Sequence, residues 1–155
     1  MSNKLLAATC EVLPNKVLAK LGEANIKAVG TPKFTPEDQK FGEEILKSLG
    51  KEPKGETFDT TITFADLTKT FPNLKIVPAS TDEGNVTWMV PTVSFRSAVA
   101  AKGTPLHTWQ NVCQTGSAPA FKSALAASKW MAATALDCLT KPEIISEAWK
   151  EHNQY

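Results

Sequence analysis

An alanine-rich stretch from Pro119 to Leu139 is the feature that most constrains the fold of this chain of 155 residues. Alanine has the highest intrinsic helix propensity, and its short side chain lets a helix pack closely on a neighbouring sheet. The stretch therefore predicts one long helix at the centre of the C-terminal half.

Local signals for the beginning and end of a helix mark two further helices near the N-terminus. Asn15 is a typical N-cap residue, and Gly30 is placed to end the helix that begins there. Thr35 precedes a proline and two acidic residues, which suit the positive end of a helix dipole, and Gly50 ends that segment. The spacing of Thr140 and Glu143 matches a capping box and predicts a last helix.

Several segments have the apolar or alternating character of β-strands. The predicted strands are residues 4–12, 58–64, 74–80, 92–100 and a further segment at 107–113. Residues 86–90 are compatible with a strand or a short helix, because periodicity cannot decide over five residues. Strands alternating with helices predict an α/β fold in which helices flank a layered sheet.

Composition excludes several classes of function. The net charge of +1 and the interspersed charges give no electrostatic footprint for nucleic acid or an anionic membrane. No apolar run approaches the ~20 residues of a membrane span. The three cysteines share no metal-binding spacing, and their odd number suits a reducing compartment. We therefore expect a soluble cytoplasmic protein that binds neither nucleic acid nor membrane.

His107 is the residue most suggestive of chemistry, because the chain has only one other histidine, His152 near its C-terminus. A metal site needs three or four ligands, and Asp82 or Glu83 are the candidates that accompany His107. The loops 80–85 and 103–108 each follow a predicted strand, and such loops meet at the ligand-binding edge of an open α/β sheet. The alternative is a loop histidine that packs against Trp109.

Two longer strings resemble a known family. Residues 80–112, STDEGNVTWMVPTVSFRSAVAAKGTPLHTWQNV, and residues 122–144, KSALAASKWMAATALDCLTKPEI, resemble the C-terminal part of M20-type metallo-amidohydrolases. Within that family they are most similar to the aminobenzoyl-glutamate utilization protein B branch. The similarity covers most of the chain and is weakest between residues 50 and 75.

The resemblance implies a metal-dependent hydrolase. Such enzymes have a catalytic α/β domain interrupted by a small lid domain, and they hold two divalent ions, zinc or manganese, with histidines and carboxylates. A glutamate activates the attacking water, and the amide of an N-acyl amino acid is cleaved. On this basis residues 1–12 are a remnant of the last lid strand, and residues 13–155 are the C-terminal part of the catalytic domain.

For the site, the resemblance implies that His107 is the last metal ligand. The other ligands and the base glutamate precede the lid in the family and have no counterpart in this sequence. Because one imidazole cannot hold a catalytic metal, we expect no catalytic residue, no stably bound metal and no hydrolysis by this chain alone.

The residues near His107 in the family pattern would support the site. The resemblance places Ser80, Thr81, Asp82, Thr104 and Trp109 where they orient a ligand or contact substrate. For Asp82 the alternative is a helix cap over residues 83–90, and for Trp109 it is plain packing.

Two hypotheses of different classes follow. The chain is a piece of an amidohydrolase, either truncated or half of a split enzyme whose N-terminal half is a separate chain, and it acts on a small-molecule amide. Alternatively, it is a non-catalytic α/β remnant that binds itself or a partner. In either case we expect a homo-oligomer, because a domain cut at the lid junction exposes apolar surface.

Overall fold

Six helices form the regular structure of residues 4, 7–62 and 81–155, the part of the chain that the computed structural model describes. They are α1 (Lys16–Val29), α2 (Pro36–Ser48), α4 (Glu83–Thr87), α5 (Trp109–Thr115), α6 (Ala118–Thr140) and α7 (Pro142–His152).

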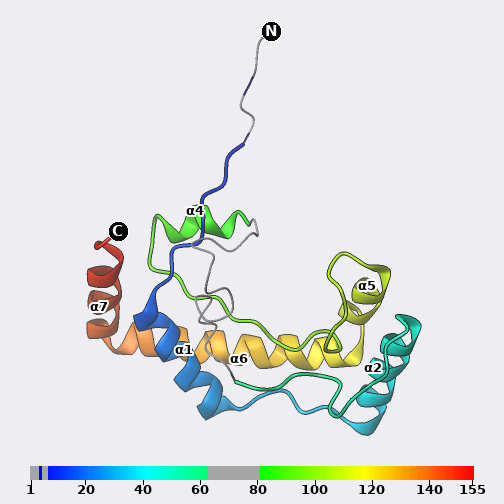
Figure 1. Cartoon of the computed structure of the whole chain (residues 1–155). Coiled ribbons are helices and arrows are strands. Elements are labelled where there is room, and N and C mark those ends of the chain that lie inside the picture. Colours follow the sequence, from blue (N-terminus) through cyan, green and yellow to red (C-terminus); the bar gives the residue numbers. More distant parts are fainter. Residues whose placement is uncertain (1–3, 5–6, 63–80) are drawn as a thin grey trace.

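The long helix α6 confirms the prediction from the alanine-rich stretch, and the other elements are arranged along it (Figure 1). Helices α1 and α7 pack at its C-terminal half, and α5 packs near its N-terminal end. The indole Nε1 of Trp130 in α6 donates a hydrogen bond of 2.9 Å to the carbonyl of Gly30, where α1 ends. Because Trp130 is buried, this bond helps fix α1 against α6.

The predicted caps of the first two helices are confirmed. The side chain of Asn15 accepts a hydrogen bond of 3.0 Å from the Leu18 amide and caps α1. Thr35 and Asp38 form a reciprocal capping box at the start of α2. Lys122 of α6 also donates to the Asp38 carboxylate. Burial raises the pKa of Asp38, but the bonds from Lys122 and the Thr35 amide outweigh it and hold the pKa below its ordinary value.

The predicted last helix is present as α7, but its predicted cap at Thr140 is wrong, since the helix begins at Pro142. The hydroxyl of Thr140 donates to the Leu136 carbonyl within α6, and α7 has no side-chain cap. Instead, α7 caps another helix. The two carboxylate oxygens of Glu151 each accept a hydrogen bond of 3.0 Å, from the amides of Lys16 and Val17 at the start of α1. These bonds satisfy two amides that a helix N-terminus leaves free.

The predicted α/β fold is wrong, because the described residues contain no β-strand. The described residues of the predicted strands 4–12, 58–64 and 92–100 form no strand pairing. Residues 63–64 and the predicted strand 74–80 lie outside the described residues. An extended segment becomes a strand only when another backbone pairs with it. Segment 92–100 packs on helices instead: Phe95 lies 6.4 Å from the Trp130 ring, and the Ser123 hydroxyl donates to the Ala98 carbonyl at 2.7 Å.

The strand predicted at 107–113 is also wrong, because these residues form helix α5. The hydroxyl of Thr108 accepts a hydrogen bond of 3.3 Å from the Asn111 amide and caps this helix. Residues 86–90 form no strand: Val86 and Thr87 are the last residues of α4, and residues 88–90 form turns and a bend, so the helical alternative holds for the first two residues.

The N-terminal segment lies against α4 (Figure 1). The side chain of Asn85 binds this segment twice, accepting from the Cys10 amide at 2.8 Å and donating to the Ala8 carbonyl at 3.2 Å. The contact is close at Gly84, where a Cβ atom would lie 1.9 Å from the carbonyl oxygen of Cys10. The division of the chain into a lid remnant, 1–12, and a catalytic part, 13–155, stays a prediction.

None of the helices in the described ranges is both long enough and apolar enough to cross a membrane.

Candidate functional site

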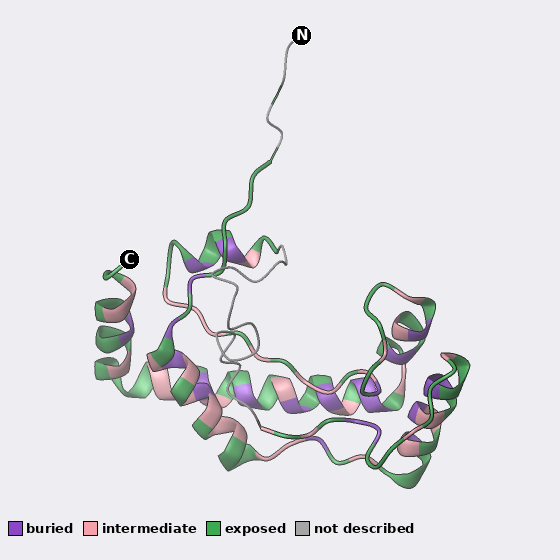
Figure 2. Ribbon diagram, viewed as in Figure 1, coloured by how far each residue is buried: buried purple, intermediate pink, exposed green. Residues whose placement is uncertain are grey.

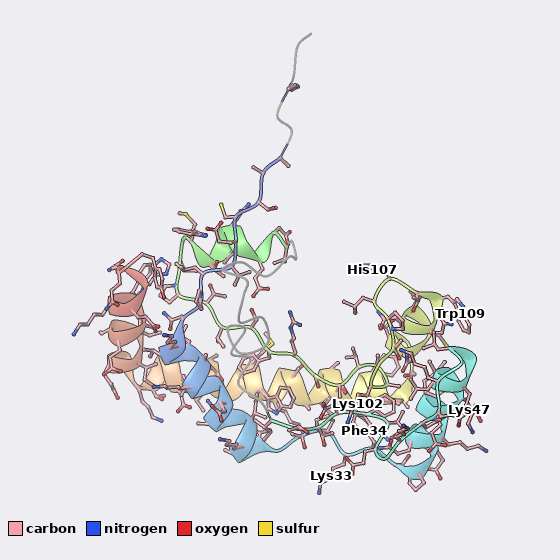
Figure 3. The ribbon with its side chains drawn as sticks, in the orientation of Figure 1. Lys33, Phe34, Lys47, Lys102, His107 and Trp109 are labelled. Atoms are coloured by element: carbon pink, nitrogen blue, oxygen red, sulfur yellow. The ribbon has the colours of Figure 1, made fainter. Side chains whose placement is uncertain are left out.

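His107 lies at the tip of the loop that joins segment 92–100 to α5. Its side chain is exposed, and Figure 3 shows it on the loop that extends away from α6. Among the described residues His107 is the one non-glycine with a positive φ, which is 60°. A left-handed backbone conformation is uncommon for such residues, and it persists only when the surrounding structure imposes it. The loop therefore presents this imidazole to solvent in a defined, slightly strained conformation.

Hydrogen bonds fix this loop at its base and at its end. Gly103 has a φ of 87° within a turn closed by the Thr104 amide, which donates to the Ala101 carbonyl at 3.0 Å. Lys51, which follows α2, donates through its ammonium to the Gly103 carbonyl. At the other end, the hydroxyl of Thr108 donates to the Pro105 carbonyl at 2.9 Å.

A buried amide that the sequence analysis did not identify completes these contacts. Gln114 of α5 is 0% exposed, and its side chain bonds to Ala101, Thr104 and Gln110. No sequence signal singled it out, because a glutamine in a short apolar segment has many equivalent roles.

The second predicted loop precedes α4. Ser80 lies outside the described residues, and Thr81 and Asp82 are exposed. Asp82 occupies the N-cap position of α4, but its carboxylate makes no capping hydrogen bond. The hydroxyl of Thr81 instead accepts from the Glu83 amide at 3.2 Å. The carboxylate of Asp82 is thus not used as a helix cap and remains accessible to solvent.

The structure does not bring the two loops together. The start of α4 and the loop of His107 lie apart in Figure 1, and no hydrogen bond between described side chains joins His107 to Asp82. No three His, Cys, Asp or Glu residues in the described part of the chain are grouped so that they could hold a metal ion. Within the described ranges, His107 therefore has no neighbouring group of ligands.

Thr104 and Trp109 flank His107 differently. The Thr104 hydroxyl accepts a hydrogen bond of 3.1 Å from the side-chain nitrogen of Gln114, so it is already used within the loop. Trp109 is the first residue of α5 and is 65% exposed, so little of its surface is used in packing within the described chain (Figure 3). Their predicted contacts with substrate stay predictions.

Comparison with curated proteins finds a similar hydrolase. A subunit of the p-aminobenzoyl-glutamate hydrolase of Escherichia coli (strain K12) is 28% identical over an alignment of 165 positions. The resemblance to this branch is confirmed. The alignment covers 95% of this chain but 34% of the relative, so the chain spans about a third of the length of that protein. No protein-family profile matches the chain, and no solved structure matches it significantly.

Proposed function

We propose that this chain supplies the His107 segment of an M20-like, metal-dependent amidohydrolase that cleaves N-acyl amino acid amides such as aminobenzoyl-glutamate. The observation that carries the proposal is the exposed imidazole of His107, a residue with a left-handed backbone in a hydrogen-bonded loop, within a chain similar to part of a hydrolase. Histidine is the commonest metal ligand among side chains, and the site of a ligand must be held in place.

The missing parts of the active site would come from other residues. Zinc or manganese would need further histidine and carboxylate ligands, and a glutamate would serve as base. The alignment leaves about two thirds of the E. coli protein without a counterpart in this sequence. The missing groups would belong to a polypeptide equivalent to that part, either in the same protein or as a separate chain. Without them this chain would be inactive.

A chimera tests the proposal. The aligned third of the E. coli protein is replaced by this chain, and the product is assayed with zinc or manganese for hydrolysis of aminobenzoyl-glutamate. We expect turnover that a chelator abolishes, because the chimera holds both sets of residues. The control is the E. coli protein without its aligned third, which we expect to be inactive. A chimera that folds but never hydrolyses the substrate, beside an active intact E. coli protein, would contradict the proposal.

The exposed face of α6 favours a second candidate, association of this chain with itself. One face of the helix is buried against α1 and segment 92–100, and Figure 2 shows buried and exposed positions alternating along it. The opposite face is also apolar, and its exposed residues recur at helical spacing. They are Phe121, Ala124, Leu125, Ser128, Met131, Ala132, Ala135, Leu136 and Leu139.

A helix that is apolar all round is normally buried on all sides. On the exposed face of α6 only Lys129 carries a charge, and Leu139 is 83% exposed. A second copy of the chain would cover this face, as expected for the non-catalytic alternative and for the predicted homo-oligomer.

The substitutions Leu125→Glu and Leu139→Glu test this association. Each substitution places a charge in an apolar contact that would stabilise the dimer by about 1.5–3 kcal/mol. We therefore expect the dissociation constant of the dimer to rise at least tenfold. Sedimentation equilibrium measures the constant, and Gln154→Glu in the exposed C-terminus controls for the added charge. A wild-type chain that stays monomeric at high concentration would exclude the second candidate.

A further inference from the structure

We propose that Gln114 is the positioning residue of His107: its buried side chain holds the loop in the conformation that presents the imidazole. This inference deepens the proposed function and rests on His107 having a chemical role. It comes from three hydrogen bonds and from the strained backbone of a single residue.

The carboxamide of Gln114 links three points around the loop. Its oxygen accepts a hydrogen bond of 2.6 Å from the Ala101 amide, where the loop begins. Its nitrogen donates to the Thr104 hydroxyl at 3.1 Å and to the Gln110 carbonyl at 3.0 Å. One side chain thus ties the entrance and the first turn of the loop to the helix that follows it.

The geometry leaves little room for substitution. Gln114 is fully buried, so any polar atom of its side chain that lost a partner would have no water to replace it. Asparagine is one methylene shorter and could not reach both ends. Glutamate keeps the acceptor for the Ala101 amide and can accept from the Thr104 hydroxyl, but it has no donor for the Gln110 carbonyl.

The conformation of His107 needs such a support. A φ of 60° is uncommon for a residue with a Cβ, although histidine adopts it more readily than most, so contacts around the loop help to hold it. The bonds of Thr108 to Pro105 and to Asn111 fix the C-terminal side of His107. Gln114 binds Ala101 and Thr104 on the N-terminal side, so the backbone of Leu106 and His107 lies between two hydrogen-bonded points.

The test compares Gln114→Met, a substitution of similar length without hydrogen bonds, with the wild-type chain by NMR. We expect the Ala101 amide to exchange with solvent roughly tenfold faster relative to amides in the middle of α6, since it loses its acceptor. The one-bond Cα–Hα coupling of His107, which distinguishes positive from negative φ, should shift toward the ordinary value. Gln114→Glu keeps an acceptor for the Ala101 amide and should restore its protection.

A matched control is Gln110→Met on the same helix. The side chain of Gln110 makes no hydrogen bond among the described residues, so both readouts should remain as in the wild type. A merely structural role of Gln114 would lower protection throughout the chain and leave the coupling of His107 unchanged in the folded fraction. That result would overturn the inference.

If Gln114→Met does not fold, Thr104→Val decides. Valine has the shape of threonine but lacks the hydroxyl that binds Gln114. The coupling of His107 should therefore shift in the same direction as in Gln114→Met, but by a smaller amount. An unchanged coupling in the folded Thr104→Val variant would overturn the inference.

The two proposals fail separately. Both NMR readouts use the chain alone, so they do not depend on hydrolysis. A coupling of His107 that depends on Gln114, together with an inactive chimera, would leave the positioning role standing and refute the proposed function. An active chimera with an insensitive coupling would do the reverse.

Discussion

Replacing Gly84 with alanine is expected to lower the free energy of unfolding by about 2–3 kcal/mol, despite the higher helix propensity of alanine. The added Cβ would lie 1.9 Å from the carbonyl oxygen of Cys10 and 2.9 Å from its carbonyl carbon. Both are backbone atoms of another segment, so the N-terminal segment must move away from α4.

That movement breaks hydrogen bonds beyond the clash. The Leu13 amide donates to the Thr87 hydroxyl at 2.8 Å, and the indole of Trp88 donates to the Glu11 carbonyl at 2.9 Å. With the bond from the Cys10 amide to Asn85, three bonds are at risk, each worth about 0.5–1.5 kcal/mol.

Urea denaturation measures the effect, and the chain provides a matched control. At Gly116 the φ is negative and a new Cβ would meet no atom within 4 Å, so Gly116→Ala should leave the stability unchanged or raise it slightly. Equal stability of Gly84→Ala and Gly116→Ala would show that the N-terminal segment does not pack on α4 as described.

Replacing His107 with asparagine in the chimera is expected to lower turnover by more than about 100-fold. Loss of a group that merely orients a metal ligand costs about 10- to 100-fold, so loss of a ligand should cost more. Asparagine adopts a left-handed backbone more readily than most residues, so the loop should keep its shape while the imidazole is lost.

His152 provides the control for this substitution. It lies at the end of α7, where its ring stacks edge-on against Trp149 at a centroid distance of 5.2 Å. His152→Asn should leave turnover unchanged. If both variants lost activity equally, or neither did, His107 would have no special role in hydrolysis.

The sequence predicted the elements whose signals are local. Asn15 and Thr35 cap helices through residues three positions away, and the alanine-rich stretch forms α6 from its own propensity. Thr108 is a local signal of the same kind, but the prediction of a strand at residues 107–113 did not use it, and α5 forms there.

What the sequence could not predict depends on residues far apart in the chain. The alternation of segment 92–100 does not distinguish a strand from an extended segment that packs on a helix. Glu151 caps a helix 135 positions earlier, and Lys122 binds Asp38 across 84 positions. At the candidate site, His107 stood out in the sequence as one of two histidines, and the resemblance then pointed to the same residue, whereas the hydrogen bonds of Gln114 depend on where its three partners lie in the structure.

The proposal that residues outside this sequence complete the active site is tested most directly by an assay of the purified chain alone, with added zinc or manganese, for amide hydrolysis. We expect no turnover of aminobenzoyl-glutamate by a folded chain, because one imidazole supplies neither a complete metal site nor a base. Metal-dependent turnover that His107→Asn abolishes in the isolated chain would contradict the claim that its active site is completed by residues outside this sequence.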